Sequence, residues 1–131
     1  MFDLIGHTAS INSVAWSPDE RFILTASQDG TARIWDASNG VQLKILNVDA
    51  NYANYAAWNG DGSRIVTAGA DGVVRIWDAR QGSELTTLIG HEDEALRATW
   101  NKAGDQVLSF SLDGTARLWD VETGEERLQL A

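Results

Sequence analysis

The sequence predicts an all-β fold that repeats one four-stranded antiparallel unit three times. An eight-residue segment recurs every 42 residues, as DGTARIWD at 29–36, DGVVRIWD at 71–78 and DGTARLWD at 113–120. Each copy opens with Asp-Gly, a strong signal for a tight hairpin turn, because glycine tolerates the positive φ that primed turns need. The next residues alternate in direction, as a strand requires. We therefore expect three repeats, each organised around this turn and strand.

Four strands are predicted in each repeat, joined by short turns. Strands in this order, with tight connections, are typical of an antiparallel meander. No linker rich in Pro or Ser separates the repeats, so neighbouring units are expected to pack directly on one another. The predicted strands span 11–16, 22–27, 31–35 and 41–46, then 54–58, 64–68, 73–77 and 84–88, then 96–100, 106–111, 115–119 and 127–130.

We expect residues 1–131 to form a single array, with repeats at approximately 6–46, 48–88 and 90–130. Residues 1–5 are expected to be an extra outer-strand segment. The reason is that Met1–Leu4 aligns through the period with Leu85–Leu88, a fourth strand, as does Arg127–Leu130. The chain would then carry a redundant fourth strand that can complete a unit in its own chain or in a neighbouring one.

Composition excludes several classes of function. The net charge is −9 and the pI about 4.4, which disfavours nucleic acids and anionic membranes as partners. No apolar run approaches the roughly 20 residues of a membrane span, and the N-terminus does not read as a secretory signal. There are no cysteines, hence no disulfides and no thiolate metal site. We expect a cytoplasmic protein without a metal or other cofactor.

The repeats also share residues near their ends. Gly6-His7 and Gly90-His91 open two of them, and Trp-Asp closes all three third strands, as at Trp119-Asp120. A strand-only period near 40 residues with these signals is typical of a propeller blade. Over essentially its whole length the chain resembles the WD-repeat β-propellers. The resemblance implies three propeller blades that form an open arc.

The resemblance also implies a buried hydrogen-bonded network in each blade. It joins a His before the innermost strand, a Ser or Thr on the second strand, the Asp of the hairpin and the Trp of the third strand. These groups can satisfy one another as donors and acceptors. The residues are His7, Thr25, Asp29 and Trp35 in the first blade, Thr67, Asp71 and Trp77 in the second, and His91, Ser109, Asp113 and Trp119 in the third.

The middle blade departs from this pattern, because Val48-Asp49 stands where the other blades have Gly-His. We expect its network to be incomplete, with Asp49 turned outward and the preceding loop the most irregular of the three. Three further arginines, Arg33, Arg75 and Arg117, occupy equal positions and are interpreted as strand surface residues with carboxylate neighbours.

A His beside Asp and Ser or Thr also invites a catalytic interpretation. We reject it, because the arrangement repeats along the strands instead of converging on a cleft, and no oxyanion donor is indicated. The Trp residues at the ends of the inner strands, at 16, 58 and 100, could stack on a sugar or a methyl-lysine. Their regular placement favours packing between blades instead. We therefore predict that the protein is not an enzyme.

In WD-repeat proteins the narrow face, made by the loops before the inner strands and by the Asp-Gly hairpins, commonly binds peptides or proteins. By position, the resemblance implies the third and fifth residues after the His and the residue before the hairpin Asp as contacts. The run Glu92-Asp93-Glu94 makes this face acidic and favours a basic partner. The candidates are Ser10, Asn12 and Gln28, then Tyr52, Asn54 and Ala70, then Glu94, Leu96 and Leu112.

Closed propellers need roughly 4–8 blades, and this chain supplies three. An open arc exposes apolar surface at both ends, which favours association. The chain could be a fragment of a longer propeller, an engineered or decayed array, or a homo-oligomer that closes a ring. We expect the homo-oligomer, with three chains favoured over two, because blades of this family usually meet at a narrower angle than sixfold closure demands.

These observations together predict a non-catalytic protein-interaction scaffold built from WD-repeat blades. One alternative is a small-ligand or glycan receptor that uses the central channel. Another is a structural repeat fragment or engineered array with no dedicated partner. The sequence does not name a partner, because fold alone does not fix function.

Overall fold

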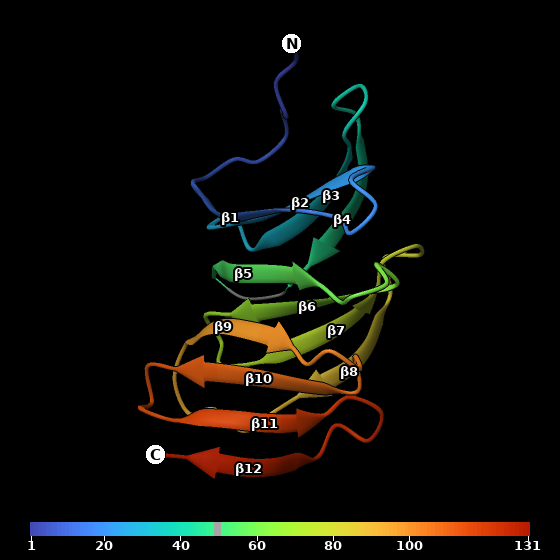
Figure 1. Ribbon diagram of the computed structural model, residues 1–131. Helices are drawn as coiled ribbons and strands as arrows, with labels where there is room; N and C mark the ends of the chain where they lie inside the picture. The colour runs from blue at the N-terminus through green and yellow to red at the C-terminus, as the bar shows by residue number, and fades with distance from the viewer. Residues whose placement is uncertain (49–50) are drawn as a thin grey trace.

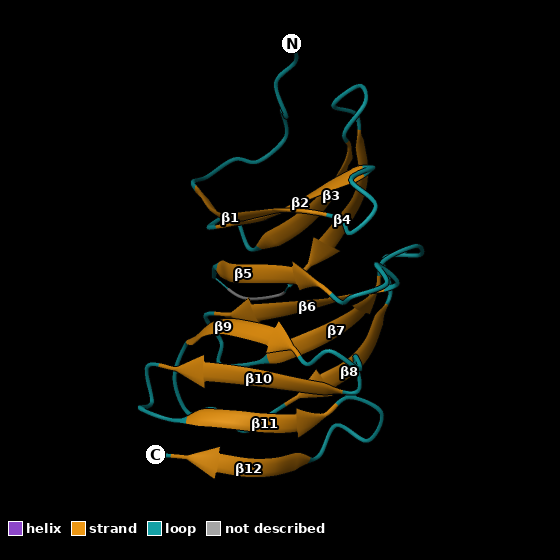
Figure 2. Ribbon diagram, viewed as in Figure 1, coloured by secondary structure: helices purple, strands orange, loops and turns teal. Residues whose placement is uncertain are grey.

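The computed structural model describes residues 1–48 and 51–131, which form three four-stranded antiparallel sheets (Figures 1 and 2). The predicted all-β fold of three such units is confirmed, and each predicted strand agrees with the structure to within one residue at either end. The expected outward turn of Asp49 lies outside the described residues. The strands are β1 (Ile11–Trp16), β2 (Phe22–Ser27), β3 (Thr31–Asp36), β4 (Gln42–Asn47), β5 (Ala53–Trp58), β6 (Arg64–Gly69), β7 (Val74–Asp78), β8 (Glu84–Leu88), β9 (Ala95–Trp100), β10 (Gln106–Ser111), β11 (Ala116–Asp120) and β12 (Glu126–Leu130).

Each sheet keeps its strands in sequence order, and the sheets follow one another from the N-terminus to the C-terminus (Figure 1). The innermost strand of one sheet packs on the preceding sheet: β5 contacts β1 and β2, and β9 contacts β5 and β6. The array stays open. The face of the first sheet that points away from the second sheet, and the face of the third sheet that points away from the second, have no neighbour in the described chain. The expected open arc of blades is therefore present.

Two apolar cores lie between successive sheets. In the first, Leu24 and Ile34 of one sheet meet Ala56 and Ile65 of the next, all buried. Val48, which replaces the glycine of the Gly-His pair, is also completely buried in this core. The second core repeats the arrangement one period later with Val66, Ile76, Ala98 and Val107. The hydrophobic contact between blades is thus the main stabilising element of the array.

The Asp-Gly hairpins differ in detail from the primed turns that the sequence suggests. Only the glycine has a positive φ, 84° at Gly30 and 83° at Gly114, whereas the preceding aspartate does not. The Gly30 N–H donates to the Ser27 carbonyl at 3.2 Å. This is a type I turn followed by a glycine in the left-handed region, another connection that suits the twist of two antiparallel strands.

Every inner strand contains a β-bulge at the same repeat position. The pairing register between β1 and β2 shifts between Ile11 and Ser13, which leaves Asn12 as the additional residue. The equivalent shifts in the other sheets leave Asn54 and Leu96. A bulge redirects a side chain out of the ordinary alternation. In this chain it aims residues of the inner strand toward the following sheet.

Residues 1–10 carry no strand in the structure. The ring of Phe2 lies against Gly40, in the turn between β3 and β4. The extra outer-strand segment expected at residues 1–5 is therefore not paired with any sheet of its own chain.

Candidate functional site

The first blade brings its four predicted network residues together. The Asp29 carboxylate only accepts hydrogen bonds, so the proton on His7 Nδ1, 2.8 Å from Asp29 Oδ2, is donated to it. His7 Nε2 then accepts from the Thr25 hydroxyl at 2.6 Å. The same Thr25 oxygen accepts from the Trp35 indole N–H at 2.9 Å. The chain of bonds runs without a gap from the hairpin aspartate to the buried tryptophan.

The third blade repeats this chain with a serine in place of threonine. His91 Nδ1 lies 3.0 Å from Asp113 Oδ2, and His91 Nε2 lies 2.7 Å from the Ser109 hydroxyl. Trp119 donates to that hydroxyl at 2.8 Å. The His91 side chain is completely buried. Because both imidazole nitrogens are engaged below the surface, the histidine is not placed to meet a substrate.

The middle blade keeps only part of the network. Trp77 still donates to Thr67 at 2.9 Å. Asp71 instead binds the Arg75 guanidinium at 2.8 Å, and its side chain is 28% exposed where that of Asp29 is 5% exposed. The described residues supply no imidazole to join Asp71 to Thr67. The Trp–Thr pair and the Asp–Arg pair are therefore separate units.

Arg75 and Arg117 are buried and the Arg33 side chain is only 12% exposed, so the interpretation of these arginines as surface residues is wrong. Arg75 and Arg117 are each 8% exposed, because strands lie on both sides of them and a loop covers the guanidinium in the third blade. The expected carboxylate neighbours are present: Arg117 binds Glu126 at 2.9 Å and also lies 3.6 Å from Asp113. A buried guanidinium needs such partners.

The glycine of each Gly-His pair leaves room for this arginine. A Cβ on Gly90 would lie 2.7 Å from a terminal nitrogen of Arg117 and 2.9 Å from the Trp119 ring. We predict that Gly90→Ala lowers the free energy of unfolding by about 1–3 kcal/mol through overpacking. Gly60→Ala is the matched control, since nothing lies within 4 Å of its Cβ position. Equal urea midpoints for the two variants would contradict the prediction.

In two of the hairpin aspartates, Asp29 and Asp113, the pKa lies below the ordinary value for this side chain. Burial alone would raise the pKa of Asp29, but hydrogen bonds from Thr31, His7 and the Thr8 backbone outweigh it and hold the pKa well below its usual value. The same balance of burial and hydrogen bonds lowers the pKa of Asp113. The Arg127 side chain is the main cause that lowers the pKa of Asp120, to about 2.

These shifts predict acid instability. A carboxyl whose pKa is lowered by folding stabilises the protein above its unfolded pKa, and that stabilisation is lost as the pH falls toward the folded pKa. We expect the urea midpoint to fall steadily below about pH 4, the ordinary range of aspartate. Denaturation measured at a series of pH values checks this. Replacing Asp29 and Asp113 with Asn should flatten the pH dependence, and an unchanged slope would contradict the assignment.

The narrow-face candidates meet in pairs across each blade. The Gln28 N–H donates to the Ser10 carbonyl at 2.8 Å. In the same way the Ala70 N–H donates to the Tyr52 carbonyl and the Leu112 N–H donates to the backbone carbonyl of Glu94, both at 3.0 Å. Each loop before an inner strand is therefore tied to the hairpin beside it. Among these residues Tyr52 and Leu112 present large exposed side chains.

The bulge residues have a different position from the rest of the candidates. The Asn12 amide donates to the Ala53 carbonyl of the next sheet at 3.0 Å, and the Asn54 amide donates to the Ala95 carbonyl at 3.0 Å. These amides link successive blades. Leu96, the third member, cannot donate such a bond and has no following sheet in the described chain. Sequence reasoning missed this role, because a bulge leaves no clear signal in one sequence.

Within the described residues, no group of three His, Asp or Glu side chains is placed to hold a metal ion. Over the same residues, no helix has the length and apolar character needed to cross a membrane.

The profile of the family described as "WD domain, G-beta repeat" matches the chain three times, at residues 1–36, 41–78 and 82–120. These matches cover most of the sequence. The chain belongs to the WD-repeat family. Each match ends at a Trp-Asp pair and starts with the outer-strand position of the preceding blade, so the WD-repeat profile is offset by one strand from the sheets of the structure. WD-repeat proteins are generally non-catalytic scaffolds for protein interactions.

Curated WD-repeat relatives match over single repeats. The chain is 54% identical over 35 residues to "Probable cytosolic iron-sulfur protein assembly protein Ciao1" of Culex quinquefasciatus, which is 27% of this chain and 10% of that protein. It is 51% identical over 37 residues to "Set1 complex component swd1" of Schizosaccharomyces pombe, 28% of this chain and 9% of the relative. The WD-repeat segment thus spans about a tenth of these relatives.

Solved WD-repeat structures share the fold over almost the entire chain. The "Crystal structure of RRP9 WD40 repeats" aligns with a TM-score of 0.90 and 23% identity, covering 97% of this chain and 40% of that one. The "Structure of U3-55K" aligns with a TM-score of 0.89 and 24% identity, covering 97% and 41%. At this identity the likeness establishes the arrangement of three consecutive blades.

Proposed function

We propose that the chain is a non-catalytic interaction scaffold whose blades complete a propeller by head-to-tail self-association. The observation that carries this proposal is the repetition of the blade interface at the two open ends. Positions that are buried between blades inside the chain are exposed at both ends of the array, with large apolar side chains. What covers such a face within the chain is another blade of the same kind.

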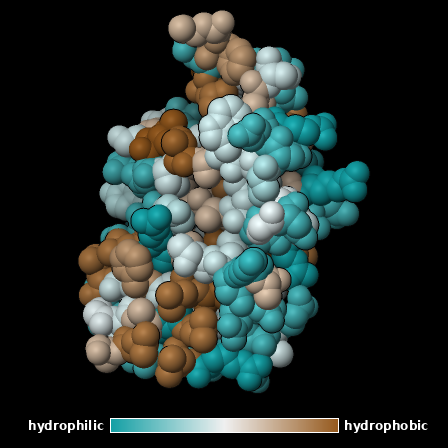
Figure 3. Space-filling view, in the orientation of Figure 1, coloured by the Kyte–Doolittle hydropathy of each residue, from teal (hydrophilic) through white to brown (hydrophobic). Residues whose placement is uncertain are grey.

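The open face of the third sheet repeats a buried face of the second. Phe110 stands one period after Ala68, which is completely buried against the next blade, whereas Phe110 is 45% exposed. Leu108 and Leu130 are exposed in the same way, one period after the buried Val66 and Leu88. Figure 3 shows apolar side chains gathered over the strands of this last sheet.

The open face of the first sheet carries the complementary positions. Val14 is 68% exposed and Trp16 is 61% exposed. One period later, Ala56 is buried and Trp58 packs against the core between the first two sheets. A second copy placed head-to-tail would bring Val14 and Trp16 onto the face that contains Phe110. Both ends carry larger apolar groups than the internal junctions, which increases the apolar area available for association.

Ring closure fits the symmetry of this contact. A head-to-tail interface joins two different faces, so it closes only when the rotation per chain completes a circle. Three chains would give nine blades and two would give six, and we infer three. Residues 1–5 of one copy align through the period with the outer-strand position that β12 fills in the next copy, so only one of the two can pair there when the ring forms.

We further propose that the narrow face of this ring binds a basic protein segment. The loops and hairpins at 8–12, 28–30, 51–54, 70–72, 92–96 and 112–114 contain no Lys or Arg. They contain exposed carboxylates at Glu92 and Asp93, beside the exposed Tyr52 and Leu112. Aromatic and apolar side chains among charges of one sign suit an interface with a cationic peptide.

Selection of a random peptide library on the immobilised protein tests this binding role. We expect basic peptides to be enriched, and Tyr52→Ala or Leu112→Ala to weaken their binding by about tenfold, as loss of a central contact does. Lys102→Ala is the control, because it lies in the β9–β10 turn at the opposite end of its sheet. Peptides that bind all variants equally would contradict the proposed face. No enrichment would favour a structural array, and selective glycan binding would favour the small-ligand alternative.

The cytoplasmic location belongs to the same proposal. It is supported by the absence of cysteine and by the word "cytosolic" in the name of one relative.

A further inference from the structure

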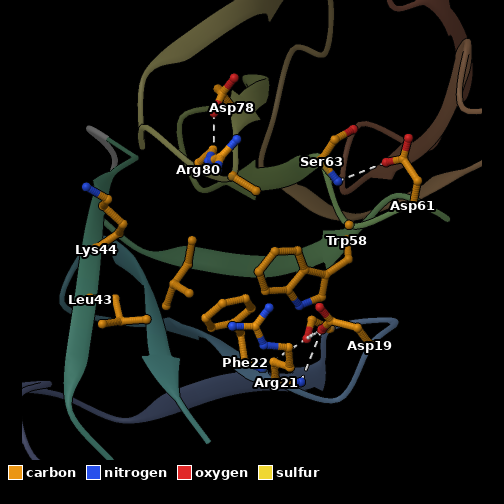
Figure 4. Close-up of a pocket in the computed structure, with 14 residues that line it drawn as sticks. Asp19, Arg21, Phe22, Leu43, Lys44, Trp58, Asp61, Ser63, Asp78 and Arg80 are labelled. Atoms are coloured by element: carbon orange, nitrogen blue, oxygen red, sulfur yellow. Dashed lines mark hydrogen bonds between the residues drawn. The ribbon is translucent and has the colours of Figure 1, made fainter.

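A pocket of about 690 Å³ opens between the first two sheets, away from the narrow face and from both open ends of the array (Figure 4). Phe22 and Trp58 lie at its centre, with ring centroids 6.5 Å apart. Leu43 from β4 adds apolar surface at one edge. The rim carries three basic and three acidic side chains, Arg21, Lys44, Arg80, Asp19, Asp61 and Asp78.

Each carboxylate of this pocket already accepts a hydrogen bond at its Oδ1 atom. Asp19 accepts hydrogen bonds from the Ser17 hydroxyl and from the backbone N–H of Arg21, at 2.7 and 3.1 Å. Asp61 accepts from the backbone of Ser63 at 2.9 Å. Asp78 accepts from the backbone N–H groups of the two residues at 80 and 81, at 2.9 and 2.8 Å. Each carboxylate is engaged by its own turn.

The indole and cationic side-chain donors of the pocket have no hydrogen-bond or ion-pair partner among the described residues. The indole N–H of Trp58 is buried and has no hydrogen-bond partner among the described residues. Arg21, Lys44 and Arg80 have no ion pair in the described part of the chain. Arg21 lies over the Phe22 ring, 5.4 Å from its centroid. A buried donor without a partner is costly, so the pocket has a place for an acceptor.

The next blade junction shows what a filled version of this pocket looks like. One period later Phe22 and Arg80 are replaced by Arg64 and Glu122, which form an ion pair at 2.9 Å. There the indole N–H of Trp100 donates to the Ala57 carbonyl at 3.3 Å. The same position of the fold is thus bridged at one junction and open at the other. Phe22 and Arg80 form no such bridge, and they leave an aromatic floor beside a guanidinium that has no ion pair in the described part of the chain.

We propose that this inter-blade pocket binds a carboxylate carried on an apolar group. The apolar part would rest on Phe22, Trp58 and Leu43, and the carboxylate would accept from the Trp58 indole and from the basic rim. Charge-assisted bonds of this type are the strong ones, and Arg is well suited to a carboxylate. The same chemistry is available from an acidic residue flanked by aliphatic side chains in a peptide and from a free aryl or alkyl carboxylic acid.

Titration followed by the indole ¹H–¹⁵N signals tests the proposal, with the Trp58 signal assigned through Trp58→Phe. The probes are acetyl-Leu-Glu-Leu-amide, its neutral analogue acetyl-Leu-Gln-Leu-amide, and 3-phenylpropionate. We expect the Trp58 signal to move with the Glu peptide and not with the Gln peptide. A response to phenylpropionate stronger than to the Glu peptide would assign the site to small carboxylic acids, and the reverse would assign it to peptides.

Two variants keep the test decisive. Arg80→Gln changes an exposed side chain and should weaken the Glu-peptide response about tenfold, as expected for loss of a charge-assisted bond. Phe22→Arg combined with Arg80→Glu copies the bridged junction and should abolish the response while the other five indole signals stay dispersed. Lys102→Ala is the control and should bind normally. Equal shifts with the Glu and Gln peptides, no shift with any probe, or an unaltered response in Arg80→Gln would overturn the proposal.

Discussion

Thr25→Val is expected to lower the free energy of unfolding by about 2–5 kcal/mol, because it leaves two buried polar groups without a partner. The Thr25 hydroxyl donates to His7 Nε2 and accepts from Trp35 Nε1. Valine has nearly the same shape as threonine, so the substitution creates no cavity. The cost therefore reports the broken network and not lost packing.

The middle blade provides the matched control for this substitution. Thr67 makes the same bond to Trp77, at the same distance of 2.9 Å, but no imidazole among the described residues contacts it. Thr67→Val should therefore cost about 1–3 kcal/mol, for one unsatisfied donor. Urea denaturation of both variants at one fixed protein concentration compares them directly. If Thr67→Val proved as costly as Thr25→Val, the histidine would add nothing to the network.

The second large effect concerns the two open faces. Phe110→Glu and Val14→Glu should each weaken the proposed self-association by about 100-fold or more, because each places an unpaired carboxylate in an apolar interface. Either change blocks every contact of a head-to-tail ring, since each contact uses both faces. A mixture of the two variants retains one intact contact, from the Phe110 face of one variant to the Val14 face of the other. That mixture should form a two-chain complex and stop there.

Native mass spectrometry of the separate and mixed variants measures this outcome. Gln81→Glu adds one negative charge in an exposed turn and is the control, with association expected to remain at the wild-type level. Recovery of association in the mixture identifies the interface as head-to-tail. A mixture that stays monomeric, or variants that associate as the wild type does, would show that these faces do not meet.

Much of the fold could be predicted because it rests on local signals that repeat. Each Asp-Gly pair marks a hairpin, and each alternating stretch before Trp35, Trp77 or Trp119 marks a strand. The type of turn was harder to predict, because Asp-Gly fits both a primed turn and a type I turn with a following left-handed glycine. The burial of Arg75 and Arg117 also escaped prediction, since a lone charged residue on a strand usually faces water.

Contacts between blades are harder to predict from a single sequence. The role of Asn12 depends on a bulge that aims its amide at a carbonyl in the next sheet. The open pocket depends on which side chains face one another 58 residues apart, as Phe22 and Arg80 do where Arg64 and Glu122 form a bridge one period later. A periodic sequence predicts that blades pack, but the filling of each junction is set by individual side chains.

The mass of the native assembly tests the central claim most directly, namely that the open ends of this WD-repeat array cover one another. Sedimentation equilibrium over a range of protein concentrations is predicted to give three times the 14.3 kDa chain mass. A mass twice that of one chain would agree with the head-to-tail contact but would show that the ring contains two chains instead of three. A well-dispersed species of 14.3 kDa at every concentration would contradict the claim.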